Sequence, residues 1–223
     1  MNFYLFLPII LTLTNAAPVD RRATSTTCPT YTIINTRGTA EPQGQSSGFR
    51  TMNSQLTSTL SGANVYNTVY PAGIDQNSTQ GTQDIINKIT STLLDSPDEC
   101  FILEGYSQGA AATLNAMPQL TGASFDAVKG VLFIGNPNHK SGLVCNVDNN
   151  GGTTTRDVNG ATVATGQTVP ENWISKTLDV CIFGDGVCDT AHGIGINLQH
   201  LQYPTDTPTQ NLGTEFILKQ LGG

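Results

Sequence analysis

The sequence contains few charged residues, and basic ones are the scarcer kind. Charged side chains make up 12% of the 223 residues, with 10 Lys and Arg against 17 Asp and Glu, which gives a formal net charge of −7. Nucleic-acid phosphates and anionic membrane surfaces do not attract a chain with this balance. We therefore expect no nucleic-acid partner.

Apolar runs long enough to span a membrane are also lacking. The one long apolar run covers residues 3–13, is followed by small residues and is too short to cross a bilayer as a helix. Such a run at the start of a chain is typical of a secretory signal peptide, which we assign to residues 1–16. We therefore expect a secreted, extracellular protein with no integral membrane segment.

The rest of the chain shows no internal repeat and no linker. A dibasic pair, Arg21-Arg22, follows the apolar run and predicts a short pro-segment at residues 17–22. Residues 23–223 are then enough for one domain with a complete hydrophobic core. We expect this single domain to act as a monomer.

Metal-ligand spacing is absent, because no Cys-x-x-Cys pair occurs and the three histidines are scattered. The five cysteines are an odd count, which in an oxidising compartment predicts two disulfides and one free thiol. Cys181 and Cys188 could close a small loop. Cys28 and Cys100 could tie the N-terminal end to the central sheet, which would leave Cys145 unpaired.

Apolar patterning predicts alternating strands and helices. The expected strands cover residues 31–36, 64–70, 101–106, 128–134 and 177–182, and the expected helices cover residues 49–60, 81–94, 108–117 and 214–221. This order favours an α/β fold with a five-stranded, mainly parallel sheet and helices on both faces. Residues 138–170 are polar and predict a long excursion with a hairpin near Asn159-Gly160.

The stretch Gly105-Tyr106-Ser107-Gln108-Gly109 organises the chain. It follows a predicted strand and precedes a predicted helix, so it indicates a tight elbow with the serine at its apex. Glycines two residues to either side let the backbone turn without a Cβ clash. A serine exposed on such an elbow is a candidate nucleophile. The alternative is a helix-capping serine in a glycine-rich turn.

A serine hydroxyl becomes a good nucleophile only when a base takes its proton, so a histidine must reach it. In this class of fold the order along the chain is serine, acid, histidine, and His139 lies too early for that order. His192 and His200 both lie late enough. We favour His200, which sits between apolar neighbours shortly before a proline, and keep His192 as the alternative.

The acid that orients the histidine has three candidates. Asp179 falls within a predicted strand, Asp185 lies between Cys181 and Cys188, and Asp189 lies just outside that pair. We favour Asp185, because a short disulfide loop would hold its carboxylate in place. Asp189 is the alternative.

Acyl transfer also needs two donors aimed at the developing oxyanion. One is the backbone N–H of the residue after the nucleophile, Gln108. The other is expected from the loop after the first strand, where Gly38-Thr39 permits a close approach and the threonine hydroxyl could add a third donor. Arg37 and Glu41 could pair to hold this loop.

With these motifs the chain resembles the fungal cutinases, and most closely the yeast cutinase-like enzymes that act on polyesters. The resemblance covers essentially the whole mature region. It rests on Tyr-Thr-Ile-Ile-Asn-Thr-Arg-Gly-Thr at 31–39, Gly-Tyr-Ser-Gln-Gly-Ala-Ala-Ala-Thr at 105–113, Gly-Asp-Gly-Val-Cys at 184–188 and His-Leu at 200–201.

The resemblance implies an α/β-hydrolase without a large lid. It implies a catalytic triad of Ser107, His200 and Asp185, with Thr39 and Gln108 forming the oxyanion hole. No metal or cofactor is implied.

The resemblance further implies disulfides between Cys28 and Cys100 and between Cys181 and Cys188. Members of the family hydrolyse cutin, short- to medium-chain acylglycerols and often aliphatic polyesters. We therefore expect a serine esterase that acts on an insoluble or lipid-like ester.

Two other functions remain open. Acetylxylan esterases share this fold and the Gly-Tyr-Ser-Gln-Gly motif, so a carbohydrate esterase is one alternative. A non-catalytic wall-binding protein that kept the fold is the other. Four apolar residues near the candidate base could form a rim for an acyl chain, or could simply pack on the core: Ile194, Ile196, Leu198 and Leu201.

Overall fold

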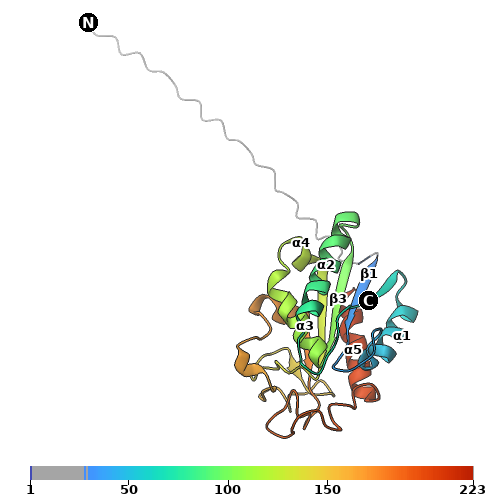
Figure 1. Ribbon diagram of the computed structural model, residues 1–223. Coiled ribbons are helices and arrows are strands. Elements are labelled where there is room, and N and C mark those ends of the chain that lie inside the picture. The colour runs from blue at the N-terminus through green and yellow to red at the C-terminus, as the bar shows by residue number, and fades with distance from the viewer. Residues whose placement is uncertain (2–27, 29, 223) are drawn as a thin grey trace.

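The computed structural model describes Met1, Cys28 and residues 30–222 of the chain (Figure 1). The signal peptide at residues 1–16, the pro-segment at 17–22 and the first residues of the predicted domain lie largely outside the described residues. The described chain forms one six-stranded sheet with the strand order β2-β1-β3-β4-β6-β5, and every neighbouring pair of strands is parallel.

The strands are β1 (Tyr31–Thr36), β2 (Ala63–Asn67), β3 (Cys100–Tyr106), β4 (Val128–Ile134), β5 (Asn146–Val147) and β6 (Thr177–Val180). Five of them match the expected strands. The expectation of five strands was wrong by one, because β5 pairs with β6 inside the polar excursion through only two residues. A strand this short leaves no periodic signal in the sequence.

The helices are α1 (Arg50–Thr59), α2 (Thr79–Asp95), α3 (Gln108–Ala116), α4 (Ala123–Ala127) and α5 (Thr207–Gln220). The last helix begins seven residues earlier than predicted. Its first turn is capped by Asp206, whose side chain accepts a hydrogen bond from the backbone N–H of Thr209 at 3.0 Å. This turn buries polar side chains, so an apolar pattern could not reveal it.

The hairpin predicted near Asn159-Gly160 was also wrong. The described excursion contains β5, one 3-10 segment at Val163–Thr165 and no antiparallel pair, and a second 3-10 segment, Glu171–Lys176, follows it. Gly160 serves close packing instead, since a Cβ there would lie 2.4 Å from the carbonyl oxygen of Pro137.

Side chains of the central strands alternate between two cores, one on each face of the sheet. Ile33 packs with α1 and α5 through Met52 and Ile217, whereas Ile34 packs with α2 and α3 through Ile85 and the alanines of α3. Figure 1 shows these two helix pairs on opposite sides of β1 and β3. Burial of each large apolar side chain contributes about 1.5–3 kcal/mol, so the sheet is a rigid support for the loops at its edge.

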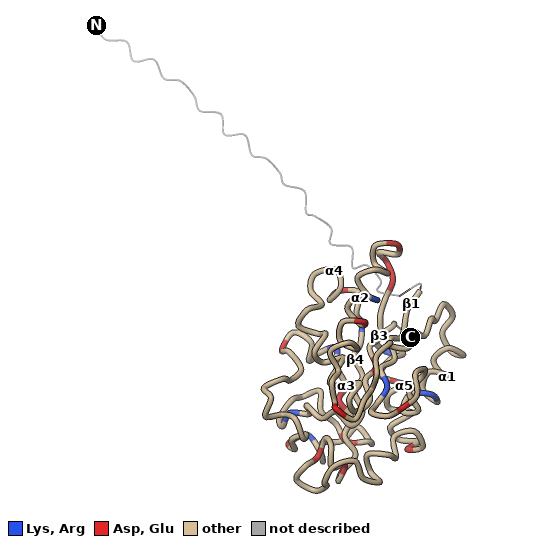
Figure 2. Tube along the Cα trace, viewed as in Figure 1, with Lys and Arg blue, Asp and Glu red and all other residues tan. Residues whose placement is uncertain are grey.

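Because all six strands are parallel, the segments that follow them gather at one edge of the sheet. The loops of the second half of the chain lie at that edge, at the lower end of Figure 1. Charged residues are scattered thinly along the trace (Figure 2). Among the described residues no helix is both long and apolar enough to cross a membrane.

Candidate active site

Ser107 lies between β3 and α3 with a strained backbone. Its φ is 54° and its ψ is −119°, a conformation that residues with a side chain rarely adopt. The flanking glycines serve close packing: a Cβ on Gly105 would lie 2.6 Å from the Cα of Ala110, and one on Gly109 would lie 2.1 Å from the carbonyl oxygen of Thr36. The elbow therefore presses against β1 and presents Oγ at the edge of the sheet.

His200 reaches Ser107 from a loop 93 residues further along the chain, and its Nε2 lies 3.0 Å from the Ser107 Oγ. The imidazole packs against Gly135, where a Cβ would lie 2.7 Å from the ring. The backbone of His200 is held at both polar groups. Its N–H donates to Asn197 Oδ1 at 3.0 Å, and its carbonyl oxygen accepts from the Tyr106 hydroxyl at 2.6 Å.

Asp185 lies behind the imidazole and is fully buried. Both of its carboxylate oxygens lie 2.9 Å from His200 Nδ1. The disulfide between Cys181 and Cys188 closes the loop that carries it. The backbone N–H of Val187 donates to its Oδ1 at 2.8 Å, which fixes the carboxylate within this loop. The second disulfide joins Cys28 to Cys100, and Cys145 is a buried free thiol.

The other acid and base candidates pair with each other elsewhere. His192 Nδ1 lies 2.9 Å from Asp189, whose carboxylate is fully buried and also accepts from the N–H of Gly184 at 3.0 Å. His139 lies 3.1 Å from Asp179. Burial is the largest single influence on the pKa of His139 and lowers it, but the charge and hydrogen bond of Asp179, together with the Thr155 carbonyl and the Asp189 charge, raise it by more, so the net shift is upward.

The loop after β1 is organised by Arg37 and Glu41, although not as the expected ion pair. Arg37 is buried, and its guanidinium donates to the carbonyl oxygens of Glu41, Thr68 and Tyr70. The Glu41 carboxylate accepts from the backbone N–H of Gly38 at 2.6 Å, and from further donors on Ser46 and Ser47. Each charge therefore satisfies backbone and hydroxyl groups and holds Gly38 beside Ser107.

Thr39 lies beside Ser107 and is paired with a residue that the sequence did not single out. The Gln76 side chain bonds the Thr39 hydroxyl, with Nε2 at 3.1 Å and Oε1 at 3.3 Å from Oγ1. Gln76 has a φ of 59°, and Gln108 Nε2 donates to the nearby carbonyl oxygen of Gly73 at 3.0 Å. A polar residue in an exposed loop carries no spacing signal, so only the fold reveals this contact.

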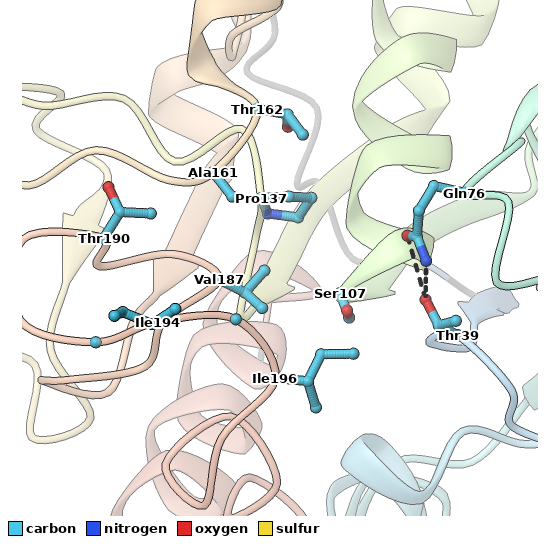
Figure 3. Close-up of a pocket in the computed structure, with 13 residues that line it drawn as sticks. Thr39, Gln76, Ser107, Pro137, Ala161, Thr162, Val187, Thr190, Ile194 and Ile196 are labelled. Atoms are coloured by element: carbon cyan, nitrogen blue, oxygen red, sulfur yellow. Dashed lines mark hydrogen bonds between the residues drawn. The ribbon is translucent and has the colours of Figure 1, made fainter.

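A cleft of about 470 Å³ opens beside Ser107 (Figure 3). Thr39 and Gln76 lie on one side of it, and Val187, Ile194 and Ile196 lie on the other. A second, smaller cleft of about 140 Å³ shares Ser107, Thr39 and Ile196 with the first. The smaller cleft is lined further by His200, Leu201 and Pro204. The four residues of the expected apolar rim are exposed rather than packed on the core.

No metal site accompanies these residues within the described part of the chain, where no group of three or more His, Cys, Asp or Glu side chains could hold an ion. A serine on a strained elbow, an imidazole and a buried carboxylate, in that geometry on a parallel sheet, define the class of the α/β-hydrolases.

Within that class the comparison with known families is specific. The family model described as "Cutinase" matches residues 27–221. The chain therefore belongs to the cutinase family and is a serine esterase, a hydrolase of carboxylic esters, as the sequence predicted.

Relatives agree with this assignment. A solved cutinase-like protein from Cryptococcus sp. is 64% identical, with a TM-score of 0.87, over 90% of this chain and 99% of that one. The cutinase of Monilinia fructicola is 27% identical over 91% of this chain and 88% of its own. The catalytic core domain of acetyl xylan esterase from Trichoderma reesei is 27% identical, with a TM-score of 0.69, over 87% of this chain and all of that one (100%).

Proposed function

We propose that Ser107 is the nucleophile of this esterase, that His200 is its general base and that Asp185 orients and stabilises the imidazole. The observation that carries the proposal is the unbroken chain of contacts, 3.0 Å from Ser107 Oγ to His200 Nε2 and 2.9 Å from His200 Nδ1 to Asp185. The backbone N–H groups of Thr39 and Gln108 form the oxyanion hole.

The reaction proceeds in two halves. His200 takes the Ser107 proton as Oγ attacks the ester carbonyl carbon, and the oxyanion hole binds the negative oxygen of the tetrahedral intermediate. The intermediate collapses, the bond to the alcohol oxygen breaks, and His200 gives its proton to that oxygen. Water then loses a proton to His200 and attacks the acyl carbon, and Ser107 recovers its proton as the acid is released.

The two clefts separate the halves of the substrate. The departing alcohol oxygen must receive its proton from His200, so the alcohol lies in the small cleft that this histidine lines. The acyl chain then occupies the larger cleft, whose wall carries Val187, Ile194 and Ile196. An apolar acyl chain gains about 0.8 kcal/mol for each methylene that it buries there.

The substrate class that fits is a lipid-like or polymeric ester: cutin, short- to medium-chain acylglycerols and aliphatic polyesters. Several apolar side chains near the cleft point into solvent. Ile194 is 92% exposed, Leu198 is 76% exposed, and Ile74, two residues before Gln76, is 87% exposed. A cluster of this kind next to an open cleft suits contact with an insoluble apolar surface.

We further propose that the protein acts outside the cell as a monomer. Two disulfides support maturation in an oxidising compartment, as the apolar run at residues 3–13 predicts. All the site residues belong to one chain, so no second copy is needed to complete the site.

The test is a rate series on esters of rising acyl length, run beside a polyester film and acetylated xylan. We expect the wild-type rate to favour butyrate or longer chains over acetate, and Ser107→Ala to lower it by at least about 10⁴-fold. Equal rates in wild type and Ser107→Ala would overturn the assignment of the nucleophile. Activity confined to acetylated xylan would favour the carbohydrate esterase, and inactivity on every ester would favour the wall-binding protein.

A further inference from the structure

A buried phenol that the reaction above does not use touches the carboxylate of the site. Tyr203 is fully buried, and its hydroxyl lies 2.7 Å from Asp185 Oδ2. The backbone N–H of Ile182 donates to the same hydroxyl oxygen at 3.1 Å. The hydroxyl has one proton, and the carboxylate is the acceptor beside it. Tyr203 therefore donates to Asp185.

The position of this hydroxyl is fixed by its surroundings. The carbonyl oxygen of Tyr203 accepts from Gln210 Nε2 at 2.7 Å, which ties the residue to α5. The ring packs edge-on against Tyr106 and His200, with centroid distances of 5.7 and 6.2 Å. Burial and the Asp185 charge hold the pKa of Tyr203 well above its usual value, so the donor stays protonated at any pH at which the enzyme works.

Each carboxylate oxygen of Asp185 therefore accepts a hydrogen bond from a donor other than the imidazole. The Val187 N–H binds Oδ1, the Tyr203 hydroxyl binds Oδ2, and both oxygens face His200 Nδ1 at 2.9 Å. Loss of either donor would free the carboxylate to rotate about its Cβ–Cγ bond. It would also concentrate negative charge on the oxygens that face the imidazole.

We infer that Tyr203 is a positioning residue of this esterase, which acts through Asp185 to hold the imidazole in line and to set the pH at which His200 can accept a proton. The inference rests on the proposed roles of Ser107, His200 and Asp185. A phenol that merely filled the core would contribute packing alone and would leave the pH dependence of the reaction unchanged.

The experiment compares Tyr203→Phe with Tyr106→Phe. The second variant also removes one buried hydroxyl from the same aromatic cluster, but that hydroxyl binds the backbone carbonyl of His200 and not the carboxylate. For Tyr203→Phe we expect kcat to fall about tenfold with KM within about twofold, the size of one lost charge-assisted hydrogen bond. The acid limb of the kcat/KM profile should move to higher pH by about half a unit, because the less solvated carboxylate holds the imidazolium more strongly. The limb should stay in place for Tyr106→Phe.

A second variant covers the case in which Tyr203→Phe folds poorly. A site-specific 3-fluorotyrosine at position 203 keeps the hydroxyl and makes it a stronger donor, so the acid limb should move to lower pH. The inference is overturned if the acid limb of the kcat/KM profile does not move in either Tyr203→Phe or the 3-fluorotyrosine variant, and if Tyr203→Phe and Tyr106→Phe lower the melting temperature equally. Tyr203 would then be a packing residue. Ser107→Ala is measured beside these variants. If the proposed triad is wrong, Ser107→Ala stays active; if only the role of Tyr203 is wrong, Ser107→Ala is inactive.

Discussion

A carboxylate that takes no direct part in the chemistry is buried in β3. Glu104 is fully buried, and one of its oxygens accepts from the side-chain amides of Asn35 and Asn53 at 2.7 and 2.9 Å. Asn35 in turn accepts from the backbone N–H of Ser46 at 2.7 Å, next to the Ser47 N–H that Glu41 binds. The group thus lies beneath the loop that holds Thr39.

Glu104 makes stability depend on pH. Burial raises its pKa from 4.5 to about 7, against the opposing effect of the two asparagines. The native state therefore binds the proton more tightly than the unfolded chain, so the contribution of Glu104 to stability is complete below about pH 4.5 and is lost as pH rises to about 7. The loss is on the order of 3 kcal/mol.

The measurement is the free energy of unfolding in urea from pH 4 to 8, for wild type and Glu104→Gln. The difference, wild type minus variant, should fall between about pH 4.5 and 7 and stay level above pH 7. The variant cannot titrate at this position, so other groups cancel in the comparison. A difference that does not change with pH would contradict the prediction.

Single residues also mark how far the sequence could specify the site. The position of Ser107 on a strand–helix elbow was predictable because glycine spacing and the change from strand to helix surround it. The choice of His200 and Asp185 over their alternatives rested on their surroundings along the chain. Gln76 and Tyr203 could not be predicted, because their contacts join residues 37 and 18 positions apart through loops whose paths no local pattern encodes.

Among the loops, the segment 193–196 forms one wall of the larger cleft. It contains two glycines, and its side-chain anchor is the neighbouring pair of His192 and Asp189. The Gly193 N–H also donates to the Asp189 carbonyl oxygen at 3.1 Å. The pair that sequence reasoning kept as the alternative acid and base thus holds one wall of the cleft that we propose for the acyl chain.

Removal of that anchor should weaken chain-length selectivity. His192→Ala frees the wall that carries Ile194 and Ile196, so the ratio of kcat/KM for a decanoate ester to that for an acetate ester should fall about fivefold. His192→Asn is the matched control, because its side-chain N–H can replace Nδ1 as the donor to Asp189 and should preserve the ratio. An unchanged ratio in His192→Ala would show that the wall does not depend on this pair.

The accuracy of the predicted elements followed their burial. β1, β3 and β4 are buried along almost their whole length, and their predicted bounds differ from the observed ones by at most one residue. β5 depends on its pairing with β6, more than 30 residues later, and on the Asn146 side chain, which donates to the carbonyl oxygens of Lys140 and Arg156. The early start of α5 depends on Gln210, which bonds Gly48 and Tyr203 across the molecule.

Exposed apolar side chains surround the cleft, and we expect them to affect the reaction rate on insoluble substrates only. Replacement of Ile74 and Leu198 together by serine removes two exposed apolar side chains, neither of which lines the cleft. Partial burial of such side chains against a polymer contributes about 1–2 kcal/mol. The initial rate on a polyester film should therefore fall about tenfold, whereas the rate on a soluble butyrate ester should change less than about twofold.

The control is Leu94→Ser. Leu94 is 85% exposed but lies at the end of α2, just before the strand whose far end leads to Ser107. It should leave both rates unchanged. Equal losses on film and soluble ester in the double variant would mean that the surface acts through the cleft and not through adsorption.

The overall fold was the feature that the sequence predicted best. The alternation of strands and helices predicts a parallel sheet, and a parallel sheet gathers the loops that follow its strands at one edge. The family model then matched residues 27–221, a range that includes all four motifs. The route of the polar excursion 138–170 was not predictable, because its path is set by single side chains such as Asp148 and Asn146 that bind backbone groups.

The parallel strands also decide where the two ends of the described chain lie. Cys28 is joined to Cys100, the first residue of β3, and Gln220 packs 3.1 Å from the Cβ position of Gly130 near the start of β4. Ser107 and Gly135 follow the opposite ends of the same two strands. A bead, a coated sensor or a fused adhesion module attached at either of these ends would thus lie at the edge of the sheet opposite the cleft. The cleft would face away from the attachment and stay accessible to a solid substrate.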